Sequence, residues 1–105
     1  MSGVPLLGGA RTAIANVFVN SDGNMAYQSN DGFTDTLTRN GTGDYTHTLS
    51  HHIAVANQCI LITLAGEGSV NYTQVSASQI QVIIKDAIGG SAKDIGYSIL
   101  IAQKQ

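Results

Sequence analysis

Charged side chains are scarce in this chain. Its 105 residues include five Lys or Arg and seven Asp or Glu, which together make up 11%, against roughly 25% in an average soluble domain. So few charges leave part of the surface weakly hydrated, and we expect some of it to pack against other chains. The net charge of −2 argues against binding to nucleic acid or to an anionic membrane, because both need a basic patch.

Cysteine is nearly absent, since Cys59 is the only one, and this excludes a disulfide within the chain. Cys59 begins the apolar run 59–62, so we expect a small, buried hydrophobic side chain. A catalytic thiolate would need a nearby base and a lowered pKa. His51 or His52 could supply that base, although nothing in the spacing requires it.

Signals for membrane insertion and secretion are missing as well. No stretch approaches the roughly 20 apolar residues of a membrane span. The N-terminus lacks the basic region and the long apolar run of a signal peptide. We therefore expect a chain that is cytosolic when it is made.

Recognised catalytic motifs are also lacking. There is no Gly-x-Ser-x-Gly turn, no paired-cysteine motif and no run of carboxylates. Two carboxylates could still converge in space, as glycoside hydrolysis requires. We expect a protein without enzymatic activity and without a cofactor. Five of the seven carboxylates are scattered across different turns and strands: Asp35, Asp44, Glu67, Asp86 and Asp94.

Three histidines, His47, His51 and His52, lie close together in the sequence. The interval between His47 and His51 suits a helix, but the neighbouring threonines favour a strand, and no fourth ligand lies nearby. We expect exposed loop histidines and no metal site. A pH-sensitive contact stays open, because only histidine has an unperturbed pKa in the physiological range.

Alternating apolar residues and frequent turn residues indicate β-structure throughout. Turns recur at intervals of about 8–12 residues, and no window has helical periodicity. We predict an all-β fold, an antiparallel, jelly-roll-like β-sandwich of about eight strands over residues 10–105. The expected strands are 10–20, 25–29, 33–39, 45–49, 59–65, 69–75, 79–86 and 96–102.

Three of these strands, 10–20, 59–65 and 96–102, are apolar on both faces. A strand in a two-sheet sandwich has only one inner face, so the other face must meet solvent, an N-terminal arm or another subunit. Together with the low charge, this pattern favours a symmetric homo-oligomer. Ile83 and Leu100, which break the alternation of their strands, are candidate interface residues.

Residues 1–9 are predicted to form an N-terminal arm. Pro5 prevents helix continuation and central-strand pairing, and the following glycine pair provides a hinge. Val4, Leu6 and Leu7 make the arm apolar, so we expect it to dock either on its own domain or on a partner.

A hairpin is predicted over residues 37–49. Two threonine-rich segments flank the sequence Asn40-Gly41-Thr42-Gly43, in which Asn-Gly favours a two-residue turn. Gly43 offers a second position for positive φ, which would give a bulged or longer loop.

Residues 38–46, Thr-Arg-Asn-Gly-Thr-Gly-Asp-Tyr-Thr, resemble a hairpin signature of small β domains in bacteriophage virion proteins. The preceding strand and the Asp22-Gly23 turn extend the resemblance over residues 10–49, whereas the second half matches only as strand-rich sequence. Such domains occur in tail fibres, head fibres and capsid decoration proteins, commonly as trimers.

The resemblance implies a trimeric decoration, or cement, protein that is assembled in the host cytoplasm and stabilises the virion head. Its partners would be further copies of the chain and the major capsid protein or another virion protein. The alternative is a tail- or head-fibre module that recognises glycan on the host surface. Six aromatic residues and no Trp weigh against that alternative.

Overall fold

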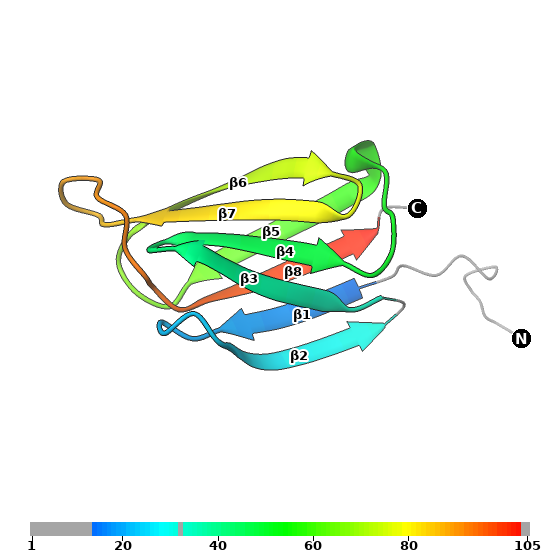
Figure 1. Ribbon diagram of the computed structural model, residues 1–105, viewed down its shortest axis with the longest axis horizontal. Coiled ribbons are helices and arrows are strands. Elements are labelled where there is room, and N and C mark those ends of the chain that lie inside the picture. The colour runs from blue at the N-terminus through cyan, green and yellow to red at the C-terminus, as the bar shows by residue number, and fades with distance from the viewer. Residues whose placement is uncertain (1–13, 32, 104–105) are drawn as a thin grey trace, which may run out of the picture.

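The computed structural model describes residues 14–31 and 33–103, and these form two packed four-stranded antiparallel sheets (Figure 1). The predicted all-β class, the sandwich and the number of strands are confirmed. No helix in these two segments is long and apolar enough to cross a membrane. The elements are β1 (Ile14–Val19), β2 (Met25–Asp31), β3 (Asp35–Gly41), β4 (Asp44–Leu49), the 3₁₀ helix η1 (Val55–Asn57), β5 (Gln58–Leu64), β6 (Ser69–Ser76), β7 (Gln79–Lys85) and β8 (Tyr97–Gln103).

The strand orders are β2-β1-β8-β5 in one sheet, called sheet A, and β3-β4-β7-β6 in the other, called sheet B. The pairs β1–β2, β3–β4 and β6–β7 are hairpins that stay within one sheet. A jelly roll instead sends most successive strands to opposite sheets, so the expected jelly-roll resemblance does not extend to the connectivity. Short turns between these strand pairs favour local hairpins, as at Asp22-Gly23, where Gly23 has φ 86°.

Alternating side chains from both sheets build the core. Val17 of β1, Ile99 of β8 and Val82 of β7 are all fully buried, and Val17 pairs directly with Ile99. Because successive strand residues face opposite sides of a sheet, the inward positions follow every second residue.

The two ends of the sandwich differ. At one end β1 begins and β8 finishes, and Ile14 pairs there with Ala102. The opposite end carries the turn at residues 20–24, the β3–β4 hairpin tip, the β5–β6 turn and the segment that leads into β8 (Figure 1). This second end is called the loop end.

Candidate self-association face and loop-end pocket

The outer face of sheet A is largely apolar. Leu61 of β5 lies beside Leu100 of β8, and Phe18 of β1 lies beside Tyr27 of β2. Leu61 is 63% exposed and Tyr27 is 59% exposed, whereas Phe18 and Leu100 are half-buried. Large apolar side chains are thus gathered in one place on the surface and not scattered singly.

The ten residues that define this face carry no formal charge, so a second copy could cover them without burying an unpaired ion. We call this set of ten the apolar face. Its members are Asn16, Phe18, Tyr27, Ser29, Cys59, Leu61, Thr63, Ser98, Leu100 and Ala102. Asp31, at the end of β2, pairs with Ile14 at the edge of the same side of the sheet.

The outer face of sheet B is polar. Thr38 of β3, Thr46 of β4, Gln81 of β7 and Thr73 of β6 lie in one cross-strand row. The predicted interface residue Ile83 is half-buried on this polar face, between Asp44 and Asn71. Ile83 and Leu100 therefore lie on opposite outer faces and cannot belong to one flat interface.

The three strands that are apolar on both faces are neighbours. They correspond to β1, β8 and β5, which stand in this order in sheet A. Their second apolar faces combine into one surface, which the sequence alone could not show. The prediction that Cys59 is buried is wrong, because Cys59 is exposed on this same face. The inward positions of β5 belong to the alternate residues Ile60 and Ile62, which pack against the core.

Asp94 joins the hairpin tip to the segment before β8. Its Oδ2 accepts a 2.6 Å hydrogen bond from Nη2 of Arg39, and its Oδ1 accepts bonds from the Gly43 N–H at 2.8 Å and the Tyr45 hydroxyl at 2.7 Å. Gly43 has φ 65°, and a Cβ there would meet the backbone of Ile84 and Lys93. Arg39, Gly43 and Tyr45, which belong to the hairpin signature, therefore all contact Asp94.

The electrostatics of this cluster hold Asp94 as a carboxylate. The hydrogen bond from Arg39 lowers the pKa of Asp94 to about 2, and the Gly43 N–H and the Tyr45 hydroxyl act in the same direction. Burial, together with the hydrogen bond to the Asp94 carboxylate, raises the pKa of Tyr45 to about 12. Asp94 is thus unsuited to donate a proton near neutral pH.

A second polar cluster lies inside the core. His47 contacts Asp35 through Nδ1 and Tyr97 through Nε2, the latter at 2.7 Å from the hydroxyl. With the ring proton on Nδ1, His47 donates to Asp35 and its Nε2 accepts the hydroxyl proton of Tyr97. Burial raises the pKa of Tyr97. We call Asp35, His47 and Tyr97 the buried triad, and it ties β3 and β4 of sheet B to β8 of sheet A.

The prediction that His47 is an exposed loop residue is wrong. His47 is fully buried, because Tyr45, His47 and Leu49 occupy successive inward positions of β4. His51 and His52 are exposed as expected. No group of three His, Cys, Asp or Glu side chains within residues 14–31 and 33–103 is placed to hold a metal ion.

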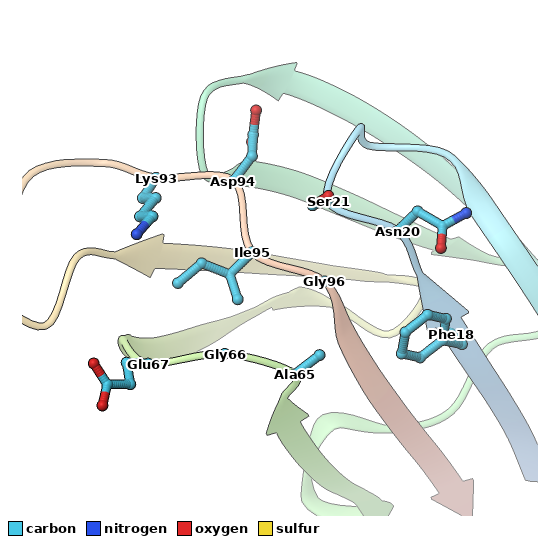
Figure 2. A pocket seen from close by; sticks show the side chains of 10 residues that line it. All are labelled: Phe18, Asn20, Ser21, Ala65, Gly66, Glu67, Lys93, Asp94, Ile95 and Gly96. Atoms are coloured by element: carbon cyan, nitrogen blue, oxygen red, sulfur yellow. The ribbon is translucent and has the colours of Figure 1, made fainter.

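The loop end contains a pocket of about 430 Å³. It lies between the end of β1, the β5–β6 turn and residues 93–96. Figure 2 shows Phe18 and Asn20 on one side of the pocket, Lys93 and Glu67 on the other, and Ile95 between them. No local sequence pattern indicates this pocket, because three segments that are distant in the sequence meet to form it.

The remaining predicted contact residues, Val4, Leu6 and Leu7, lie outside the described residues, as does the whole arm 1–9. Their docking stays a prediction.

Comparison with known proteins gave no relatives: no family model matches the chain, and no curated protein or solved structure matches it significantly.

Proposed function

We propose that this chain is a non-enzymatic structural protein of a bacteriophage virion, a homotrimer that decorates and stabilises the head. The observation that carries the proposal is the apolar face. Its ten residues carry no formal charge, and it lies on one side of a sandwich whose other side is polar.

The apolar face is suited to self-association. Burying a large apolar side chain such as Leu61 or Tyr27 is worth roughly 1.5–3 kcal/mol relative to exposure. The face carries several such side chains and no charge that would need a partner. Around a threefold axis, each copy would turn sheet A inward and leave the Thr- and Gln-rich face of sheet B in water. The choice of a trimer over other oligomers comes from the resemblance to phage domains.

The hairpin signature supports a structural role. Arg39, Gly43 and Tyr45 hold Asp94 and so fix the shape of the loop end. The buried triad is shielded from solvent, so no substrate could reach it in the folded chain. The Asp94 cluster and the buried triad both contain reactive residue types. Each is therefore explained by its role in the folded structure and not by catalysis.

The position of the first strand gives a direction to the proposed assembly. β1 begins at the end opposite the loop end. Within the proposal, the apolar arm 1–9 binds the head shell or another virion protein from that side. Three arms would bind together and gain by avidity what one short arm lacks.

Fractionation of purified virions tests the proposal directly. Heads and tails are separated, and the chain is quantified in each fraction by mass spectrometry. A decoration protein stays with the heads in many copies. Recovery with the tails would instead favour the fibre alternative, and absence from both fractions would overturn the virion assignment.

A further inference from the structure

Asn40 and Gly41 form the only Asn-Gly dipeptide of the chain. The side-chain amide of an asparagine can react with the backbone nitrogen of the next residue, and glycine hinders this reaction least because it has no side chain. Every other asparagine in the chain is followed by a residue with a side chain. Asn40-Gly41 is also not the turn of its hairpin, since that turn is Thr42-Gly43.

Asn40 lies at an irregularity of the β3–β4 hairpin. The register passes from the pair Arg39–Tyr45 directly to the pair Gly41–Asp44, so Asn40 has no cross-strand partner and the ladder is disrupted there. Asn40 is exposed, and a Cβ placed on Gly41 would meet no atom within 4 Å. Water and hydroxide can therefore reach the peptide bond between Asn40 and Gly41.

Two hydrogen bonds hold the side-chain amide of Asn40. Its Nδ2 donates to Thr46 Oγ1 at 2.8 Å and to Asp44 Oδ1 at 3.2 Å, and both acceptors belong to β4. Attack by the Gly41 nitrogen needs the amide group to rotate and its Nδ2 to leave. Both hydrogen bonds must therefore break before the reaction can occur.

We propose that Asn40 is a site of spontaneous deamidation whose rate these two hydrogen bonds control. The backbone nitrogen of Gly41 loses its proton to hydroxide and bonds to Cγ of Asn40. The Cγ–Nδ2 bond breaks, ammonia leaves, and a five-membered succinimide ring remains. Water then opens the ring at either carbonyl carbon, and residue 40 becomes aspartate or isoaspartate. In sum, one water is consumed and one ammonia is released, with no oxidation or reduction.

The product changes the charge of the hairpin tip. A carboxylate at residue 40 has no N–H to donate to Thr46 or Asp44, and it places two like charges side by side at Asp44. Isoaspartate also adds one methylene to the backbone next to Arg39, whose guanidinium bonds to Asp94. Deamidation is thus a one-way covalent change of this tip. Asn40 is not a member of the apolar face, so the proposal does not depend on self-association or on location in a virion.

The test follows the mass of the folded full chain during incubation between pH 7 and pH 9. Conversion of an amide to a carboxylate raises the mass by about one dalton, and fragmentation locates the residue. We expect conversion at Asn40 before any other asparagine, at a rate that rises with pH because the attacking nitrogen must lose its proton. In urea, which removes the two hydrogen bonds by unfolding the chain, conversion should be at least tenfold faster. Conversion elsewhere first, no conversion at Asn40, or an equal rate in urea would overturn the proposal.

Three variants test the assigned roles. Gly41→Ala adds a methyl group in open space at a position without positive φ, so the chain should fold as before while conversion falls at least tenfold. Thr46→Val removes one acceptor and keeps the branched shape, so conversion should rise several-fold. Its matched control is Thr48→Val, on the same face of β4 but without a hydrogen bond to Asn40, which should convert as the parent chain does. Unchanged conversion in Gly41→Ala would refute the ring mechanism, and unchanged conversion in Thr46→Val would refute control by hydrogen bonding.

Discussion

Asp94 illustrates how one side chain can fix two distant segments. Its depressed pKa means that its contribution to stability is present above the unfolded-state pKa of 3.8 and is lost as the pH falls toward about 2. Asp94→Asn removes the charge and keeps the shape. We expect it to cost about 1–2 kcal/mol at pH 7, less than the whole shift would imply, because the ion pair is partly exposed and screened.

Urea unfolding at several pH values checks this expectation. The difference in unfolding free energy between the parent chain and Asp94→Asn should shrink between pH 5 and pH 2. Glu67→Gln serves as the control, because Glu67 is exposed and pairs with no other described residue. A difference for Asp94→Asn that stays constant with pH would contradict the role of its charge.

Tyr97 offers a test of the buried triad. Tyr97→Phe removes the hydroxyl and leaves Nε2 of the fully buried His47 without this partner. A buried polar atom that loses its hydrogen bond costs about 1–3 kcal/mol. Urea unfolding should show this loss, whereas Tyr72→Phe at an exposed position should change stability little. Equal effects of the two substitutions would argue against an energetic role for the triad.

Single positions were predictable where the alternation of inward and outward residues agreed with hydrophobicity. Ile80 and Val82, in the alternating strand 79–86, satisfied both and are buried. At Cys59 and His47 the strand alternation and the hydrophobicity of the side chain pointed in opposite directions. The alternation decided both positions: the Cys59 thiol faces outward and the His47 imidazole faces inward. The partners of Asp94 were beyond prediction, because Arg39 and Tyr45 are far away in the sequence and no local pattern links them to it.

The apolar face leads to a prediction about sheet A as an element. Leu61→Asp places a charge within the proposed interface, where an unpaired buried ion costs several kcal/mol. Leu61 is largely exposed in the single chain, so we expect the fold to persist and the oligomer to dissociate. Light scattering should report the mass of one chain, with an unchanged circular dichroism spectrum.

Matched substitutions on the other sheet provide the control. Thr73→Asp lies on the polar face of β6 and should leave the oligomer intact. Leu100→Asp and Ile83→Asp separate the two predicted interface residues, since only Leu100 belongs to the apolar face. Dissociation caused by Ile83→Asp but not by Leu61→Asp would transfer the interface to sheet B.

The arm gives a prediction for the N-terminal element. A chain that starts at residue 10 lacks Val4, Leu6 and Leu7. Burial of these side chains at a partner is worth roughly 1.5–3 kcal/mol each, before the cost of about 1 kcal/mol or more per residue for ordering the arm. We expect an almost unchanged melting temperature and lost rebinding to stripped particles. A melting temperature many degrees lower would place the arm in the fold of its own domain or oligomer.

The strands and the two faces of each strand could be predicted from the sequence, but the pairing of strands within each sheet could not. The alternation in the predicted strand 79–86 indicated one apolar side, and β7 (Gln79–Lys85) buries that side. In the predicted hairpin, the bulged alternative is realised: β3 extends to Gly41, the two-residue turn is Thr42-Gly43 and not Asn40-Gly41, and the register shifts between Arg39 and Gly41. The bond from Gly43 to Asp94 stabilises this form, and that contact depends on a residue outside the hairpin.

For the molecule as a whole, self-association predicts a stability that depends on concentration. When folded chains associate and unfolded chains do not, mass action raises the melting temperature as the protein is concentrated. Calorimetry over a hundredfold range of concentration should show this rise, and light scattering at micromolar concentration should give three times the mass of one chain. A constant melting temperature together with a monomer mass would contradict the trimer.

The position of β8 has a consequence for how the chain folds. β8 lies between β1 and β5 in sheet A, so the centre of that sheet comes from the last described strand. The β3–β4 and β6–β7 hairpins can form early from local contacts, but sheet A cannot close until residues 97–103 have returned across most of the chain. Pairing over such a separation is slow, because the entropy of loop closure must be met before the contacts form. During synthesis on the ribosome, the edges of β1 and β5 that pair with β8 therefore stay exposed until β8 has been made. Aggregation competes most with folding during this interval.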